Sequence, residues 1–522
     1  MLKRVLNLRS VYCFLTPVVA GIYPVLYLAG VNEPLLKAGD VTRSFWVVGL
    51  GSLLIFIVVV LLAKNLVKGA LLTAIFLTLF FSYGQLYAFL ERYVKLLGHH
   101  SILVPAYVVL IALAIWLVAK NEIKIDLIRN ILIVLVALSA YTVFTQLISF
   151  EQPNREVSAQ QDLGSIKANV EPLPDVYFIV LDEYPRSDVW NEFYHYDNSS
   201  FLNNLKEMGF RVIECSQSNY TFTKLSISST LNMEYHAQLP DDRNKSQERA
   251  VDRQIVAELQ HSRVRSSLEA LGYKTVALET GYSVTEMTDA DEYIRMEPEF
   301  FLLSQFENLV YDSTALIAVR DLSIQLQTKN TDLRALLKTF NKAKFFYHLN
   351  RDNLNHLESI NKITGPKFVF AHIYITHEPF TMSANGEFLL NKQVTEDPRV
   401  TQGKYLNKRM TEILQKILSS SKTPPIIVLE SDHGVRQDEY LSTHVAVSNL
   451  MAFYVPESIK AQLYDTMTPV NSFRLVLPYL TGEHAPLLAD QSFYIYHAGD
   501  VNAIPVDQMC PVKIPPKKNK LN

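Results

Sequence analysis

The chain has 522 residues, 49% of them hydrophobic, with a mean hydropathy of +0.09 and a formal net charge of −3. This length is too great for one ordinary domain, and the slightly positive hydropathy predicts membrane segments beside a soluble part. The small net charge argues against a polyanionic partner such as nucleic acid. The three cysteines exclude a cysteine-rich metal site and a disulfide framework, although Cys215 and Cys510 could pair in an oxidising compartment.

The first 150 residues hold five long apolar runs, each without Asp, Glu, Lys or Arg. Each run is close to the ~20 residues that a helix needs to cross a bilayer. The first run is too long for the core of a signal peptide and no small-residue cleavage site follows it, so we expect it to remain as an anchor. The sequence therefore predicts a membrane domain over residues 1–150, with five transmembrane helices at 11–30, 44–63, 70–90, 101–119 and 131–150.

Basic residues are concentrated in alternate loops between these runs. They precede the first run, and they separate the second from the third and the fourth from the fifth: Lys3, Arg4, Arg9, Lys64, Lys68, Lys120, Lys124 and Arg129. Because cytoplasmic loops are enriched in Lys and Arg, this pattern places the amino terminus in the cytoplasm. An odd number of crossings then puts everything after residue 150 on the extracytoplasmic side of the cytoplasmic (inner) membrane.

A polar stretch connects the membrane domain to the first strand of a soluble domain. Residues 151–175 contain prolines and a glycine but no apolar period, which indicates a linker. The apolar run 176–181 follows and ends in Asp182 and Glu183, with Arg186 close behind as a candidate for substrate binding. Carboxylates at the end of a buried strand are candidate metal ligands. Asp182 is equally well placed to cap the next helix, which Pro185 favours, and both interpretations stay open.

A segment rich in serine and threonine, residues 219–233, follows in the chain. Apolar residues between its hydroxyls predict a short helix packed on one side. The first backbone N–H groups of a helix have no partner within it and favour an anion, so a hydroxyl at that end is a candidate nucleophile. Thr223 is the best placed, and Thr221 is an alternative. The same composition also occurs in ordinary Ser/Thr-rich segments that carry no chemistry.

The rest of the soluble chain alternates strands and helices, which is typical of a mostly parallel α/β sheet covered by helices on both faces. We expect this domain to span residues 176–504, followed by a loosely ordered tail at 505–522. The expected strands cover 211–215, 274–278, 367–374 and 449–455, and the expected helices cover 199–208, 263–271, 405–418 and, in pieces, 333–363.

Two further strands end in side chains that carry chemistry. The strand at 367–374 is followed by His377, while His372 inside the strand is interpreted as packed. Two prolines and an aliphatic run at 426–429 lead into Asp432 and His433, which offer one oxygen and one nitrogen ligand to a divalent metal. His444 stands eleven residues beyond His433. Ligands in open α/β sheets bind at the carboxyl ends of the strands, so these side chains are expected to converge there.

In this order, the strand-ending Asp182, the Thr223 segment, His377-Glu378-Pro379-Phe380 and Ser431-Asp432-His433-Gly434 resemble the sulfatase-like branch of the alkaline phosphatase superfamily. The five-helix anchor with an external domain is similar to the membrane phosphoethanolamine transferases and the lipoteichoic acid synthases. The resemblance implies that Asp182, Asp432 and His433 bind a metal, with Glu183 as an alternative. It also implies that Thr223 is the nucleophile, and that His377 and His444 hold the transferred group.

The resemblance implies a membrane-anchored, metal-dependent transferase or hydrolase of phosphate esters, and less readily of sulfate esters, in envelope lipids or glycans. The chain lacks the Cys/Ser-x-Pro-x-Arg signature of true sulfatases, since Thr223-Lys224-Leu225-Ser226-Ile227 stands in its place. Carboxylate and imidazole ligands suit Zn or Mn best, with Mg or Ca as alternatives. A second hypothesis is a catalytically inactive scaffold or binding protein of the envelope that has kept the fold.

Overall fold

The computed structural model describes residues 8–31, 38–94, 97–151, 167–241, 243, 245–296, 303–326, 342–389, 396–436, 443–496 and 502–512. The chain divides into two compact units. The membrane unit comprises residues 1–155 and 300–342, and the α/β unit comprises residues 156–299 and 343–522. Each unit has hydrophobic clusters of its own.

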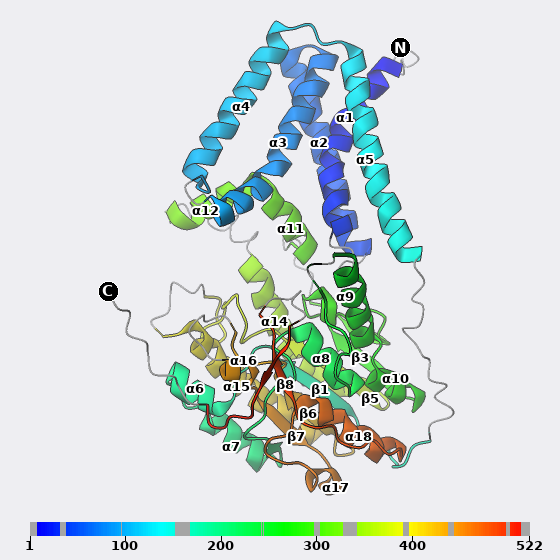
Figure 1. The fold of residues 1–522 in the computed structure, drawn as a ribbon, viewed down its shortest axis with the longest axis vertical. Coiled ribbons are helices and arrows are strands. Elements are labelled where there is room, and N and C mark those ends of the chain that lie inside the picture. Colours follow the sequence, from blue (N-terminus) through cyan, green and yellow to red (C-terminus); the bar gives the residue numbers. More distant parts are fainter. Residues whose placement is uncertain are drawn as a thin grey trace. The chain divides into compact units, whose positions relative to one another are not determined.

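The membrane unit contains the five apolar helices that the sequence predicts (Figure 1). Segments of this polarity are helical because a backbone in lipid must satisfy its hydrogen bonds within the segment. Large apolar side chains on their outer surfaces, such as Leu61 and Leu62, remain exposed, as expected of residues that face lipid. The helices are α1 (Leu8–Val31), α2 (Ala38–Ala63), α3 (Leu66–Tyr93), α4 (His100–Lys120) and α5 (Ile125–Glu151).

Two further helices of the membrane unit come from an insertion far along the chain: α11 (Gln305–Ser313) and α12 (Leu316–Leu326). Arg43 near the start of α2 forms an ion pair with Glu307, and His100 at the start of α4 contacts Asp321 at 3.1 Å. Both helix starts lie on the side of the five-helix bundle from which the chain leaves after α5. The insertion therefore contacts the same end of the bundle at which α5 ends. This agrees with an odd number of crossings and does not depend on the charge of the loops.

The insertion departs from the continuous 176–504 domain expected from the sequence, because residues 300–342 group with the membrane helices. Close packing accounts for this grouping. The Ala315 N–H donates to the Phe80 carbonyl at 2.8 Å, and a Cβ on Gly84 would lie 1.9 Å from the Asp312 carbonyl oxygen. Only a residue without a side chain allows this approach. Of the helices expected at 333–363, residues 333–341 lie outside the described part of the chain.

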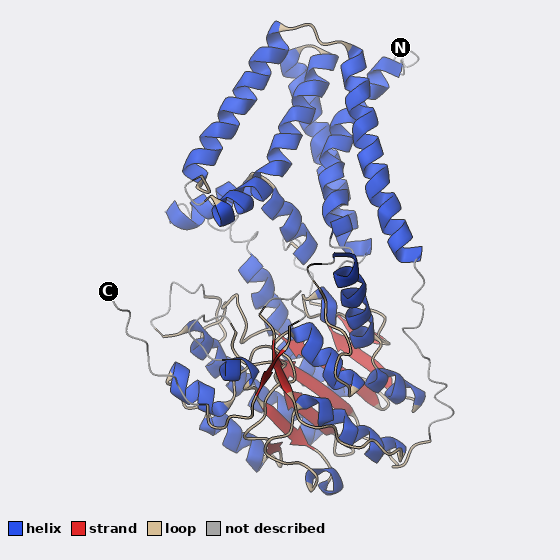
Figure 2. Ribbon diagram, viewed as in Figure 1, coloured by secondary structure: helices blue, strands red, loops and turns tan. Residues whose placement is uncertain are grey.

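The α/β unit is built on a seven-stranded sheet in the order β2-β7-β6-β1-β5-β3-β4 (Figures 1 and 2). All neighbouring pairs are parallel except those made by β7, so the expected mostly parallel sheet is confirmed. The strands are β1 (Val176–Leu181), β2 (Arg211–Val212), β3 (Lys274–Leu278), β4 (Glu292–Ile294), β5 (Lys367–Ile373), β6 (Ile426–Glu430) and β7 (Met451–Tyr454).

Helices cover both faces of the sheet, and successive residues of each strand alternate between the two cores. One face, which we call the α8 face, is covered by α8 (Thr223–Asn232), α9 (Lys245–Gln260), α10 (Arg263–Ala270) and α18 (Ser472–Thr481). The other is covered by α6 (Ser187–Tyr194), α7 (Ser199–Glu207), α14 (Lys342–Ser359) and α15 (Pro398–Ser420). The short helices α16 (Thr443–Val447) and α17 (Glu457–Lys460) flank β7.

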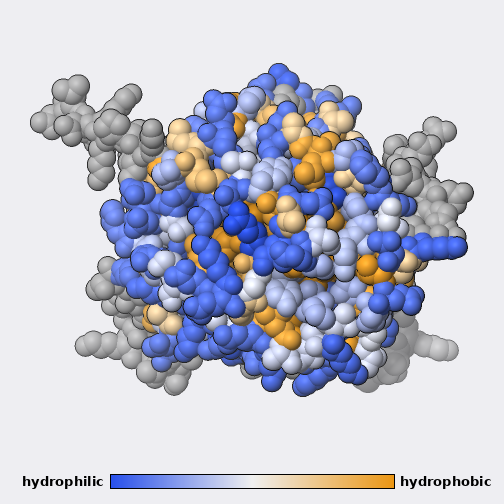
Figure 3. Space-filling model, turned by 90° about the horizontal axis from the view of Figure 1, so that it is seen from below, coloured by the Kyte–Doolittle hydropathy of each residue, from blue (hydrophilic) through white to orange (hydrophobic). Residues whose placement is uncertain are grey.

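The folded part of the α/β unit extends beyond residue 504, where the sequence predicts its end. Strand β8 (Ser492–Tyr494) pairs with β9 (Ile504–Val506), and Cys215 forms a disulfide with Cys510. Residues 505–512 therefore belong to the folded body rather than to the expected tail. A disulfide suits an oxidising compartment, in agreement with an extracytoplasmic location. The face of the α/β unit in Figure 3 is mainly hydrophilic, and its hydrophobic residues lie in small separate groups.

Candidate metal and nucleophile site

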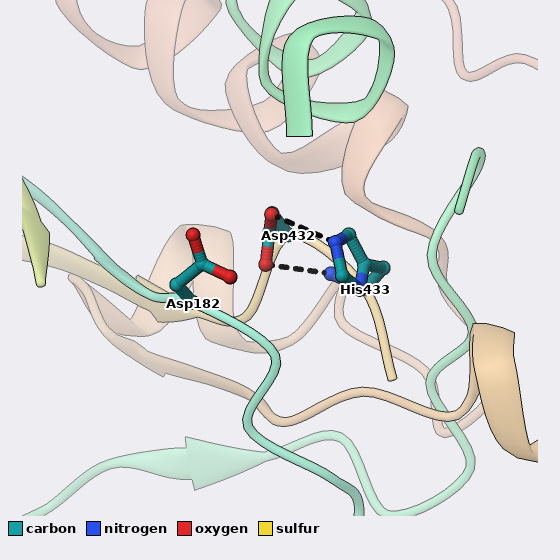
Figure 4. Close-up of side chains that lie close together, drawn as sticks. All are labelled: Asp182, Asp432 and His433. Atoms are coloured by element: carbon teal, nitrogen blue, oxygen red, sulfur yellow. Dashed lines mark hydrogen bonds and ion pairs between the residues drawn. The ribbon is translucent and has the colours of Figure 1, made fainter. Parts of the chain in front are cut away.

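Asp182, Asp432 and His433 converge at the carboxyl ends of β1 and β6 (Figure 4). One potential ligand atom from each lies within 4.8 Å of the others, and all three residues are buried. Their meeting follows from the sheet, because β1 and β6 are parallel neighbours with Val180 opposite Glu430. Two residues further along, each strand places its aspartate on the α8 face. The predicted convergence of these three side chains is therefore present in the structure.

The carboxylate of Asp432 is held by backbone groups through one oxygen only. Its Oδ1 accepts hydrogen bonds from the N–H of Glu183 at 3.0 Å and from the N–H of His433 at 2.9 Å. Its Oδ2 is buried without a hydrogen-bond partner in the described residues. Glu183 adopts φ +56°, which is strained for a residue with a side chain, and this conformation lets its N–H reach Asp432. The loop thus fixes Asp432 and leaves one oxygen free for a ligand.

The His433 ring presents a nitrogen lone pair to the same space. Its Nδ1 lies 2.7 Å from the Gly434 carbonyl oxygen, which can only accept, so Nδ1 carries the proton. The unprotonated Nε2 lies 3.3 Å from Asp432 Oδ2. Two ligands that are each about 2.0–2.1 Å from a tetrahedral zinc lie roughly 3.3 Å apart. This tautomer and spacing suit metal ligation.

Asp182 has neither carboxylate oxygen hydrogen-bonded within the described chain, although it is 1% exposed. Burial and the nearby charge of Asp432 raise the pKa of Asp182 to about 8, against weaker opposing effects of His377 and His433. A buried carboxylate without hydrogen bonds is costly unless it is neutralised or binds a cation. The unsatisfied oxygens of Asp182 and Asp432 therefore fit a divalent metal, and hard oxygen with imidazole nitrogen suits zinc or manganese.

His372, which the sequence predicts to be packed inside its strand, also lies beside the metal group. It is fully buried in β5 opposite Val180, on the α8 face, and its Nε2 lies 3.0 Å from Asp182 Oδ2. Its Nδ1 contacts the Thr285 hydroxyl at 3.1 Å, which fixes the ring. The alternation along β5 indicates this side of the sheet, because Phe368 and Phe370 lie in the same core as the β1 residues on the α8 face. His372 thus lies against the Asp182 carboxylate, although the 3.0 Å contact is not a hydrogen bond.

Thr223 is the first residue of α8 and is half-buried. Burial tends to raise the pKa of Asp432, but His433, His372, the Glu183 N–H and the Thr223 hydroxyl together hold it below its usual value. Helix α8 is fastened to the same loop because Ser226 Oγ donates to the Asp432 carbonyl at 2.5 Å. The structure therefore brings Thr223 to Asp432.

The alternative nucleophile Thr221 has a different environment. It is fully buried, and its hydroxyl accepts from the Ile495 N–H at 3.1 Å while lying 3.4 Å from the Ile495 carbonyl. These contacts fasten the β8 region to the segment before α8. A hydroxyl used in this way is poorly placed to attack a substrate.

The remaining candidates differ in how close they come to the metal group. Glu183 is absent from that group; its carboxylate contacts Arg399 at 3.3 Å and accepts from the Arg436 N–H at 2.9 Å. His377 is partly exposed, with Nε2 at 4.0 Å from Glu183 Oε2. His444 lies half-buried on α16, whose backbone packs against Gly434.

Arg186, expected to bind substrate, is instead occupied by protein groups. Its guanidinium makes two 2.8 Å hydrogen bonds to the carboxylate of Asp188, and donates at 2.8 Å to the carbonyls of Ser216 and Met509. Four of its five N–H groups are thereby used. The contacts give Arg186 a structural role near the Cys215–Cys510 disulfide.

No family model matches the sequence, and no curated protein was found similar to it. Among solved structures, the chain resembles the zinc complex of the periplasmic domain of EcEptC from Escherichia coli, at 10% identity over 64% of this chain and 92% of that one, with a TM-score of 0.42.

It also resembles the lipooligosaccharide phosphoethanolamine transferase EptA from Neisseria meningitidis, at 11% identity over 90% of this chain and 95% of that one, with a TM-score of 0.36. A third resemblance is to the lipoteichoic acid synthase LtaP from Listeria monocytogenes, at 11% identity over 59% and 71%, with a TM-score of 0.37. At such distances these likenesses carry no argument about chemistry, which rests on the residues of this chain.

Proposed function

We propose that this protein is a membrane-anchored, metal-dependent transferase or hydrolase of phosphate esters in envelope lipids or glycans, acting through a covalent intermediate on Thr223. The observation that carries the proposal is the group of buried oxygens on Asp182 and Asp432 that no described residue hydrogen-bonds, with the His433 Nε2 lone pair beside them. Such a group is costly in an inert scaffold and is accounted for by a bound cation.

Asp182, Asp432 and His433 would hold the metal. When bound, a divalent metal shields the charge of a phosphoryl group and lowers the proton affinity of a nearby oxygen. Thr223 Oγ would attack phosphorus, forming the Oγ–P bond as the bond to the leaving oxygen breaks. The hydroxyl proton would pass to solvent water, since both oxygens of Asp432 are already used, and His377 or His444 would protonate the leaving oxygen. An acceptor hydroxyl or water would then attack the phosphothreonine and free Thr223.

The anchor fits a substrate drawn from the membrane. Five candidate spans would keep the catalytic domain at the membrane, a source of both donor and acceptor. With the amino terminus in the cytoplasm, the domain would act on the outer side of the inner membrane. The disulfide between Cys215 and Cys510 supports that location.

Mass spectrometry of the full-length protein, loaded with zinc and incubated with membrane lipids, tests the covalent step. We expect a phosphate-containing adduct on Thr223, its complete loss in Thr223→Ala, and its retention in Thr223→Ser, which keeps a hydroxyl. Thr221→Ser is the matched control and should leave the adduct in place. An adduct on Thr221 would move the nucleophile, while no adduct on any residue of the zinc-loaded protein would contradict the mechanism.

A further inference from the structure

Arg436 carries a guanidinium that stacks on the residue before the candidate nucleophile and forms no ion pair within the described part of the chain. Its Cζ lies 3.5 Å from the centre of the Phe222 ring, and Phe222 directly precedes Thr223. Its backbone N–H donates to Glu183 Oε1 at 2.9 Å, which ties the base of the side chain to the strand-end loops. Stacking on an aromatic face orients a guanidinium while leaving its N–H edge available.

The nearby carboxylates have other expected partners. Glu183 pairs with Arg399 at 3.3 Å, and Asp182 and Asp432 belong to the candidate metal group. None of the ion pairs between described residues includes Arg436, and its Nε is buried without a hydrogen-bond partner there. Burial lowers the pKa of Arg436, and Tyr494, Glu183, Asp432 and Asp182 oppose that effect, so all four lie within electrostatic reach. A half-buried guanidinium that forms no ion pair with described residues is expected to bind an anion.

The start of α8 adds a second source of positive potential. Phe222 precedes the helix and offers no side-chain hydrogen bond to it. The Phe222 carbonyl accepts from the N–H groups of Leu225 and Ser226, so the earlier N–H groups of Thr223 and Lys224 are the ones without an acceptor in the helix. The guanidinium stacked on Phe222 and the open N–H groups of Thr223 and Lys224 therefore both belong to the start of α8. This arrangement suits a tetrahedral oxyanion.

We infer that Arg436 is a substrate-binding residue that holds the non-bridging oxygens of the phosphoryl group while Thr223 attacks it. This inference rests on the proposed function and deepens it, because it assigns the site an anionic tetrahedral group and names the cation that selects it. Guanidinium binds such oxygens in pairs, whereas the ammonium of lysine binds as a point charge. The two side chains are therefore distinguishable at this position.

Calorimetric titration of inorganic phosphate into the zinc-loaded, full-length protein tests the inference. We expect Arg436→Ala to weaken phosphate binding at least tenfold and Arg436→Lys to weaken it less, with zinc content unchanged in both. Arg409→Ala is the matched control, since that guanidinium pairs with Glu358 and Glu412 and should not affect phosphate. Equal phosphate affinity in Arg436→Ala and the parent protein would overturn the inference, as would no phosphate binding by the parent.

The test of phosphate binding by Arg436 can fail or succeed independently of the test for a covalent adduct on Thr223. Thr223→Ala should keep its phosphate affinity within about threefold, because it removes a hydroxyl and no cation. Loss of phosphate binding in Arg436→Ala, with no adduct on Thr223 in the parent, would support the anion site and reject the nucleophile. If Arg436→Ala does not fold, Arg436→Gln, which keeps part of the aliphatic stem and an uncharged polar end, replaces it in the same comparison.

Discussion

Two groups of charged residues, one in each unit of the protein, differ in whether their charges are paired within the protein. In the membrane unit, Arg43 pairs with Glu307, and Arg320 pairs with both Asp312 and Asp321. At the strand ends of the α/β unit, neither oxygen of Asp182 and only one oxygen of Asp432 has a hydrogen bond to a described residue, although both side chains are buried.

The difference separates a structural role from a binding role. Opposite charges that pair within the protein fasten one helix to another and need nothing further. Carboxylates that are buried together without cations repel each other, so the energy of the folded chain improves when a cation is added. Substitutions that remove a charge should therefore change metal content in one unit and only stability in the other.

The largest expected effect is that of Asp432→Asn. It removes the ligand oxygen and one of the two charges that attract the cation, so we expect zinc affinity to fall by at least 100-fold. Metal analysis after dialysis and calorimetric titration measure the change. Full zinc content in this variant would remove the basis for the metal site.

A smaller loss of affinity is expected for His372→Ala. Residues that orient metal ligands typically change metal affinity by about 10–100-fold when they are substituted. The variant should keep its fold, as checked by thermal unfolding, because among the described polar groups the ring contacts Thr285 and Asp182. Zinc affinity equal to that of the parent protein would show that His372 is only packed.

The pH dependence of zinc binding provides a third test. Since the pKa of Asp182 in the metal-free protein is raised to about 8, the group is mainly protonated at pH 7 and must release a proton when a cation binds. Affinity should therefore rise up to tenfold per pH unit below about pH 8 and level off above it. The metal-free protein should lose stability as pH rises toward about 8, because Asp182 ionises freely in the unfolded chain but stays protonated in the folded one.

Calorimetry in buffers of different ionisation enthalpy counts the released protons. The pKa of Glu430 is also raised to about 8, chiefly by burial, so the Asp182→Asn variant is needed to separate the two groups. About one proton should be released per zinc in the parent protein and fewer in that variant. Identical proton release in both would assign the titration to a residue other than Asp182.

The smallest effect is expected for Glu307→Gln in the membrane unit. Loss of its pairing with Arg43 should destabilise the unit by about 1 kcal/mol, because part of the pair is exposed and solvent screens it. Thermal unfolding in detergent measures this change, and zinc content serves as the second readout. A loss of zinc comparable to that in Asp432→Asn would abolish the contrast between the two groups.

Much of the fold was readable from local patterns. The uncharged apolar runs identify the five membrane helices, and the strand expected at 274–278 matches β3. Asp182, Asp432 and His433 were found because each follows a short apolar strand directly. Thr223 was singled out from a helix start, and the structure places it at Asp432. In each case the signal lies within a few neighbouring residues.

The rest depended on contacts between distant segments. A spacing argument cannot show that residues 300–342 return to the membrane helices, because Gly84 and Asp312 meet only through packing. The same is true of Arg186, whose guanidinium is occupied by Asp188 and by carbonyls more than 20 residues away. His372 and Arg436 acquire their roles from the neighbours that the sheet and α8 bring to them. The sequence by itself determined which segments form helices and strands, since that depends on local polarity and backbone preference. Only the tertiary structure decided which polar groups are left unpaired, because pairing requires knowing every neighbour in space.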